Sequence, residues 1–172
     1  MAIKPFPASD YLNVVGLLNR REIEVRLLAP LLEALSAEFG RERVYELTRQ
    51  VIQQIALQQG LELGRSVQSN DLEHLAIALE AWQKDNTIQI EVLQLNRKKY
   101  CFNVYRCRFA EMYHHLGLGE LGIILSCERD FAHIAGYNSN IRLIRSQTIM
   151  QGAEICDFRY ELNSARKHSG RS

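Results

Sequence analysis

The sequence predicts an α+β fold, with an N-terminal helical layer followed by a β-β-α-α-β-β unit that forms a mainly antiparallel four-stranded sheet. Three observations predict this class. Apolar residues recur at helical spacing through the N-terminal part, residues 1–87. At residue 88 the period changes to the alternation that is typical of strands. After two helical segments, the alternation returns over about 141–149 and 155–162.

Three helices account for the N-terminal part. The first is predicted from an apolar stripe at every fourth residue, and Pro30 inside that pattern should kink or split the helix. A second pattern covers about 41–59 and ends at Gly60, a typical stop signal. A third follows residues 69–71, each of which is a good helix cap. These apolar helices offer a surface through which a homodimer is possible. The stripe of the first helix consists of Ile23, Leu27, Leu31, Leu35 and Phe39, and Leu28 and Leu32 widen it.

The first predicted hairpin begins at Ile88. Its alternation shifts phase at Leu93, which predicts a β-bulge in the first strand. Residues 96–99 are expected to form the loop, and residues 100–107 the return strand. Alternation in the return strand places Cys101, Asn103, Tyr105 and Cys107 on one face and Phe102 and Val104 on the other.

Two helices, over about 108–116 and 119–135, are expected to separate this hairpin from the second one. Residues 163–172 are small and polar, which predicts a disordered tail. The chain is therefore expected to form a single domain over 1–172, with a helical part at 1–87 and an α+β part at 88–162 that carries the site.

Composition narrows the class of partner. The 172 residues are 47% apolar and 24% charged, which is enough apolar material for a core without disulfides or a structural metal. Because the net charge is only +1, we expect neither nucleic acid nor a membrane as a partner. Neither a signal segment nor an apolar run of about 18 residues is visible. A cytoplasmic location with reduced cysteines is the resulting expectation.

Three cysteines of the C-terminal half lie beside ionisable residues. A single cysteine is usually a small buried hydrophobe, and the spacing of these three matches no zinc-binding template. Nearby cations, however, stabilise the thiolate, which is the reactive form. The group therefore predicts a reactive site for a small molecule. Cys107 lies between Arg106 and Arg108, Cys127 lies three residues before Asp130, and Cys156 precedes Asp157 and Arg159.

Asp130 and two arginines are the other candidates. Cys127 and Asp130 share one helix face, so Asp130 is either a general acid–base group or a solvated helix charge. Arg145 falls on the apolar side of its strand, which indicates a charge that is paired or lies at the mouth of a pocket. Arg159 either pairs with Asp157 at the surface or forms a fork for a substrate carboxylate.

Four segments, at 107–117, 125–130, 136–138 and 145–160, together resemble the L-2-amino-thiazoline-4-carboxylic acid hydrolase family in order and spacing. One departure is Ser139, where the family pattern leads us to expect proline. The resemblance implies hydrolytic opening of a cyclic isothiourea to a carbamoyl-cysteine, with a small carboxylate as substrate and without a metal or other cofactor. The implied catalytic residues are Cys107, Cys127, Asp130 and Cys156, and the implied substrate-binding residues are Glu111, Asn138, Arg145 and Arg159.

The sequence leaves the mechanism and two other functions open. Asp130 or Glu111 activates water, or a cysteine thiolate attacks first and forms a covalent intermediate. A different function is small-molecule binding without turnover, as in four-vinyl-reductase-type domains, which the C-terminal half also resembles. The other is a zinc or iron site, in which the three cysteines bind the metal together with Asp130 or Glu111.

Overall fold

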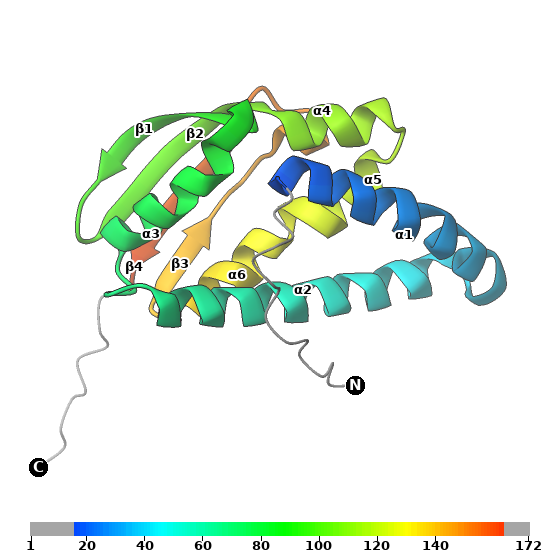
Figure 1. Ribbon diagram of the computed structural model, residues 1–172, viewed down its shortest axis with the longest axis horizontal. Coiled ribbons are helices and arrows are strands. Elements are labelled where there is room, and N and C mark those ends of the chain that lie inside the picture. The colour runs from blue at the N-terminus through cyan, green and yellow to red at the C-terminus, as the bar shows by residue number, and fades with distance from the viewer. Residues whose placement is uncertain (1–15, 164–172) are drawn as a thin grey trace, which may run out of the picture.

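The computed structural model describes residues 16–163 and confirms the α+β class. The helical layer consists of α1 (Leu17–Phe39), α2 (Arg41–Ser66) and α3 (Leu72–Leu79), which is followed by the short helix η1 (Glu80–Asn86). Figure 1 shows α1 and α2 as a hairpin that turns at its right-hand end. The predicted disordered tail, apart from Asn163, lies outside the described residues.

The helix α1 runs without interruption through Pro30, so the chain is not split there. Its buried residues are Val25 and Leu32, of which only Leu32, at the widened edge of the stripe, belongs to the pattern that predicted the helix. The stripe residues Ile23, Leu27 and Phe39 are instead 62%, 72% and 63% exposed. The most regular apolar row of the first helix therefore stays outside the core that residues 16–163 form.

The prediction that the second helix ends at Gly60 was wrong, because α2 continues to Ser66. Gly60 is needed for a close approach to α6 (Arg129–Tyr137), and not for a stop. A Cβ atom at Gly60 would lie 2.0 Å from the carbonyl oxygen of His133, and one at Gly136 would lie 2.1 Å from that of Leu57. The two helix backbones thus touch at glycines, and this contact fixes the position of α6 (Figure 1).

Four antiparallel strands form the sheet in the order β1-β2-β4-β3. The predicted strand over 141–149 ends early, at Ile144, and the chain continues through an irregular segment into the short helix η3 (Ile149–Gln151). The predicted helix over 119–135 is built from three pieces: α5, a π-helical turn η2, and α6. The strands are β1 (Ile88–Leu95), β2 (Lys99–Cys107), β3 (Ile141–Ile144) and β4 (Cys156–Leu162), and the remaining connecting helices are α4 (Arg108–His115), α5 (Gly119–Gly122) and η2 (Ile123–Cys127).

Two bulges interrupt the register of β1 and β2. The first leaves Leu93 unpaired, as the sequence predicts. The second was not predicted: Gln89 pairs with Arg106 while Ile90 pairs with Val104, so Tyr105 is the extra residue. Tyr105 and Arg106 are both exposed as a result. The prediction that Cys107 shares the face of Tyr105 was therefore wrong, because the bulge returns Cys107 to the face of Val104.

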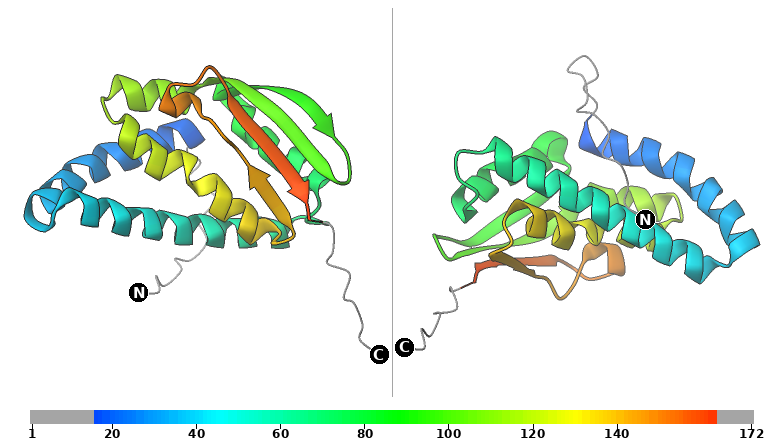
Figure 2. Two further views of the ribbon diagram at one scale, coloured as in Figure 1. Left: turned by 180° about the vertical axis from the view of Figure 1, so that it is seen from behind. Right: turned by 90° about the horizontal axis from the view of Figure 1, so that it is seen from below.

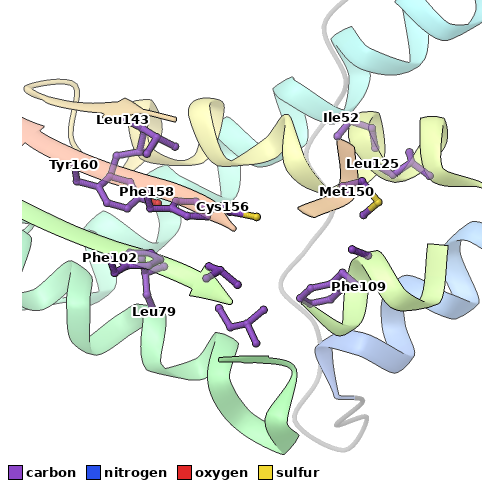
Figure 3. Packing of buried hydrophobic residues seen from close by; sticks show 14 of the residues in the cluster. Ile52, Leu79, Phe102, Phe109, Leu125, Leu143, Met150, Cys156, Phe158 and Tyr160 are labelled. Atoms are coloured by element: carbon purple, nitrogen blue, oxygen red, sulfur yellow. The ribbon is translucent and has the colours of Figure 1, made fainter. Parts of the chain in front are cut away.

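The core lies between the helices and one face of the sheet. Figure 1 shows α3 across this face, and the view from behind in Figure 2 shows the strands β3 and β4 unobstructed by the described helices. Aromatic side chains of β2 and β4 form cross-strand pairs on the inner face. The rings of Phe102 and Phe158 are 4.9 Å apart and nearly parallel (Figure 3). Tyr100 and Tyr160 stack in the same way at 6.1 Å.

Candidate functional site

A cavity of about 190 Å³ lies between the inner face of the sheet and the surrounding helices. One wall is apolar and includes Trp82, Phe109 and Phe158. The polar wall comes mostly from η2 and α6. The remaining lining residues are Leu17, Arg21, Gln59, Ile88, Val104, Cys107, Ser126, Cys127, Arg129, Asp130, His133, Arg145 and Cys156.

The π-helical turn directs the polar wall into the cavity. Residues of η2 and α6 line it at positions 126, 127, 129, 130 and 133. The extra residue per turn in a π-helix changes the phase between the helix before and the helix after it, and such turns are frequent at functional sites. The predicted pairing of Cys127 with Asp130 on one face is realised, since both side chains reach the same cavity.

Asp130 and Arg145 form a buried ion pair at the cavity. The guanidinium also donates to the backbone carbonyl of Cys127 at 2.9 Å and lies about 5 Å from the ring centres of Phe131 and Phe158. Arg145 is thus both paired and at a pocket, which were the two alternatives that its sequence position left open. Its side chain is only 6% exposed.

Burial raises the pKa of the Asp130 carboxyl to about 6, although Arg145 acts in the opposite direction. Desolvation disfavours the charged carboxylate, and here it outweighs the attraction of the guanidinium. A carboxyl with a pKa near the working pH exchanges protons readily in both directions, which suits a general acid–base group.

The segment that carries Arg145 is held by Asp157. The carboxylate of Asp157 accepts hydrogen bonds from the backbone N–H groups of Ser146 and Gln147, both at 2.9 Å, and from the Ser146 hydroxyl at 2.6 Å. Asp157 lies on β4 and faces away from the cavity-lining Phe158. The sequence suggested a surface pair of Asp157 with Arg159, but the structure uses Asp157 to fix the backbone next to Arg145.

All three candidate cysteines line the cavity, as Cys107, Cys127 and Cys156 reach it from β2, η2 and β4. Figure 3 shows the sulfur of Cys156 directed away from the aromatic row, toward the side where Phe109 and Met150 lie. This sulfur accepts a hydrogen bond from the Ile149 N–H at 3.2 Å. Strand and helix phase in the sequence could not place the three cysteines at one cavity, and the fold does.

The thiols are stabilised in their neutral form. Burial raises the pKa of Cys107 to about 11 and raises that of Cys127 further, where Asp130 adds to the effect. Burial also raises the pKa of Cys156. The sequence suggested that neighbouring arginines would stabilise thiolates, but Arg106 and Arg108 point elsewhere: Arg106 pairs with Glu111, and Arg108 donates to the carbonyl of Asp85.

The metal-site alternative requires several ligand side chains to converge on one point within residues 16–163. No group of three or more His, Cys, Asp or Glu side chains in this range could hold a metal ion. The three cysteines and Asp130 share a cavity but do not converge on a common coordination point.

Arg129 is a cavity residue that sequence reasoning missed. Its side chain is buried, at 8% exposure, and its Nη2 donates to Gln59 Oε1 at 2.6 Å. No carboxylate among residues 16–163 forms an ion pair with it. Burial and the nearby charge of Arg21 lower its pKa to about 10, which still leaves the guanidinium charged at neutral pH.

Three predicted substrate-binding residues do not reach the cavity. Glu111 is exposed on α4 and pairs with Arg106 at 2.7 Å. Asn138 caps the end of α6, where its side chain contacts the backbone of Asn70 and Asn140. Arg159 lies on the opposite side of β4 from Phe158 and donates to the Phe102 carbonyl and to Asn103. Sequence proximity to the motifs suggested these roles, whereas strand and helix phase direct the side chains elsewhere.

The sequence does hold a signal for three of the missed cavity residues, Ser126, Arg129 and His133. Polar residues recur at Ser126, Arg129, Asp130 and His133, a spacing of three to four residues that defines one helix face. A polar stripe on a helix whose other residues are mostly apolar indicates that this face borders a cavity. No local signal marks Gln59 or Arg21, because each lies about 70 to 110 residues from the segment that it joins.

The profile of the L-2-amino-thiazoline-4-carboxylic acid hydrolase family matches residues 20–160, which is most of the chain. The chain belongs to this family. The match includes every residue of the polar wall and every cysteine of the cavity, so this cavity is the candidate site of a family member. No protein of curated function matches the chain.

Two solved structures resemble this member of the L-2-amino-thiazoline-4-carboxylic acid hydrolase family. One is the phenol-responsive sensory domain of the transcription activator PoxR with phenol, at 14% identity and a TM-score of 0.49, with 79% of this chain and 73% of that chain covered. The other is trafficking protein particle complex subunit 3 from Naegleria fowleri, covalently bound to palmitic acid, at 11% identity and a TM-score of 0.48, with 83% and 97% covered.

Within residues 16–163 of this family member, none of the helices is both long enough and apolar enough to cross a lipid bilayer.

Proposed function

We propose that the protein hydrolyses a small cyclic isothiourea that carries a carboxylate, of the 2-amino-thiazoline-4-carboxylate type, and that Asp130 transfers the protons. Family membership supports the substrate class. The observation that carries the role of Asp130 is its position in the cavity, paired with Arg145 and with a pKa of about 6.

The cavity suits a substrate of this size. An engineered apolar cavity of about 150 Å³ binds benzene, so a cavity of about 190 Å³ has room for a five-membered ring with two small substituents. The aromatic wall of Trp82, Phe109 and Phe158 would pack against the ring. The polar wall would then face the nitrogen, amino and carboxylate groups.

The proposed reaction uses water as the nucleophile. The Asp130 carboxylate accepts a proton as a water oxygen bonds to the ring carbon between nitrogen and sulfur. Asp130 returns this proton to the ring nitrogen, the carbon–nitrogen bond breaks, and the oxygen–carbon double bond forms as the second water proton also moves to that nitrogen. Both hydrogens of water thus end on the released amine, and the product is a carbamoyl thioester. Arg145 keeps Asp130 in position throughout.

The high pKa values of the cysteines favour this route over a thiolate that attacks first, since buried neutral thiols are weak nucleophiles. The covalent route remains the alternative mechanism. It requires one cysteine to be indispensable, whereas the water route requires only that the cysteines fill the cavity.

The test is turnover of 2-amino-thiazoline-4-carboxylate by the full chain, with the carbamoyl-cysteine product measured by mass spectrometry. We expect Asp130→Asn to lower kcat by roughly 100-fold or more, and Glu111→Gln to retain activity because Glu111 lies outside the cavity. Each of Cys107→Ser, Cys127→Ser and Cys156→Ser should retain measurable turnover. Loss of all turnover in one of these, in a folded variant, would establish covalent catalysis instead.

A second candidate function is ligand binding without turnover. The neutral thiols and the largely apolar wall favour it, because such a cavity binds a small molecule without any reactive group. Trp82 is the single tryptophan of the chain and lines the cavity, so its fluorescence reports occupancy. A fluorescence response to the compound without product would favour this function over hydrolysis.

A further inference from the structure

The charges around the cavity do not balance. Three arginines line it, and the described structure gives two of them a carboxylate partner: Arg145 pairs with Asp130, and Arg21 pairs with Glu24. Arg129 has only the neutral amide of Gln59 as a side-chain partner. A buried charge without a counter-charge is unfavourable, and folded proteins seldom retain one unless a ligand completes it.

Most N–H donors of the Arg129 guanidinium form no hydrogen bond with the described residues. A guanidinium carries five N–H groups in a fixed fork, and one hydrogen bond from Arg129 to a residue of the described chain is formed. The geometry of the fork matches the two oxygens of a carboxylate. In contrast, Arg145 already uses its fork for Asp130 and the Cys127 carbonyl, and Arg159 lies away from the cavity.

The surroundings of Arg129 favour an anion. Arg21 also lines the cavity; burial lowers the Arg129 pKa, and the charge of Arg21 adds to this effect while Glu24 and Asp130 act against it. His133 lies one turn further along α6 and also lines the cavity, and burial together with the charge of Arg129 lowers its pKa. The hydroxyl of Tyr113 does not line the cavity, but it is buried without a hydrogen-bond partner among residues 16–163, and the charges of Arg21, Glu24 and Arg129 act on it. Asp130, which pairs with Arg145, is the one carboxylate among the described residues that line this cavity, so the positive charge of Arg129 has no counter-charge in the lining.

We propose that Arg129 is the carboxylate-binding residue of the cavity, with Arg21 as a second positive charge and Gln59 as the side chain that orients the guanidinium. This proposal rests on the proposed function, because it assumes that the ligand is a small carboxylate. It replaces the assignment of the carboxylate to Arg145 or Arg159. It also places the substrate: the carboxylate lies against α2 and α6, and the ring points to Asp130.

The test compares two ligands that differ only in the carboxylate, 2-amino-thiazoline-4-carboxylate and 2-amino-thiazoline, with Trp82 fluorescence as the readout of binding. In the unmodified chain we expect the carboxylate compound to bind roughly 10- to 100-fold more tightly, as a charged hydrogen-bonded pair requires. Arg129→Gln should abolish this preference while the affinity for 2-amino-thiazoline changes little. Arg129→Lys keeps the charge without the fork and should keep part of the preference.

The matched control is Arg26→Gln, which removes an exposed arginine of α1 outside the cavity and should leave the preference intact. Equal affinities of the unmodified chain for the two compounds, or full preference in a folded Arg129→Gln variant, would overturn the assignment of Arg129 while leaving hydrolysis untouched. If Arg129→Gln does not fold, loss of part of the preference in Arg129→Lys supports the assignment, and an unchanged preference there overturns it. Absence of any binding of both compounds would instead contradict the proposed function itself.

Discussion

At the scale of single residues, the site depends on how burial changes ordinary side chains. Asp130, Arg129 and the three cysteines are ordinary residue types, and burial of each group away from bulk solvent shifts its pKa from the usual value. Burial favours the neutral carboxyl and the neutral thiols, while Arg145 remains charged because Asp130 faces it. Burial makes Asp130 a suitable acid–base group, and it also means that ionisation of Asp130 lowers the free energy of unfolding.

The pH dependence of stability tests this effect. The pKa of Asp130 rises from 3.8 in the unfolded chain to about 6 in the fold, so folding favours the protonated form. Its stabilising contribution is therefore full below pH 3.8 and is lost as the pH rises through 6. Relative to Asp130→Asn, which does not titrate, the free energy of unfolding of the unmodified chain should fall by up to about 3 kcal/mol between pH 4 and 7 in urea denaturation. A rise over this range would show that the ion pair with Arg145 outweighs burial.

At the scale of elements, the contact between α2 and α6 decides the shape of the site. α6 carries Arg129, Asp130 and His133, and α2 carries Gln59, so the distance between the helices sets where these groups meet. The glycines at the crossing allow backbone-to-backbone contact that any side chain would prevent. A substitution there should act on stability and on the cavity together.

Gly60→Ala should destabilise the fold by about 1 to 3 kcal/mol, because its Cβ would lie 2.0 Å from the His133 carbonyl oxygen and a backbone must move. The gain in helix propensity, about 1 kcal/mol, does not offset this. Gln54→Ala, at an exposed position of the same helix, is the control and should change the unfolding free energy by less than about 0.5 kcal/mol. Equal effects of the two variants in urea denaturation would mean that the helices separate at little cost.

At the scale of the whole molecule, the exposed apolar row of α1 is the feature that the described chain leaves without a partner. Ile23, Leu27, Leu31, Leu35 and Phe39 are all at least 36% exposed. Three exposed residues of the adjacent helix α2, Leu47, Val51 and Ile55, also belong to its predicted apolar pattern. Apolar rows of this regularity are typical of helices that pack against another surface, and a second copy of the chain provides an equal row.

We therefore expect the protein to be a homodimer through α1. Light scattering coupled to size-exclusion chromatography should give twice the mass of one chain, and Leu31→Glu should convert it to a monomer. Glu38→Lys changes a charge on the same helix outside the row and should leave the dimer intact. A monomeric unmodified chain would contradict this expectation.

Much of the fold follows from local pattern. The three N-terminal helices, the change to strands at Ile88, the bulge at Leu93 and the cap of α3 by one of residues 69–71 are set by periodicity and by short-range hydrogen bonds, and all are readable in the chain. The position of Arg145, a charge on an apolar strand face, was also visible in the sequence, and it predicted a pocket or a charge partner for this residue.

The cavity was decided only by the tertiary structure. Which arginine remains unpaired depends on where the carboxylates of other elements lie, and Gln59 meets Arg129 across 70 residues of sequence. The bulge at Tyr105 turns Cys107 inward, and the helix crossing gives Gly60 a role opposite to the one that its position suggests. Periodicity assigns a side chain to a face of its own element, but only packing decides what that face meets, and burial then sets the charge of each group that lines the cavity.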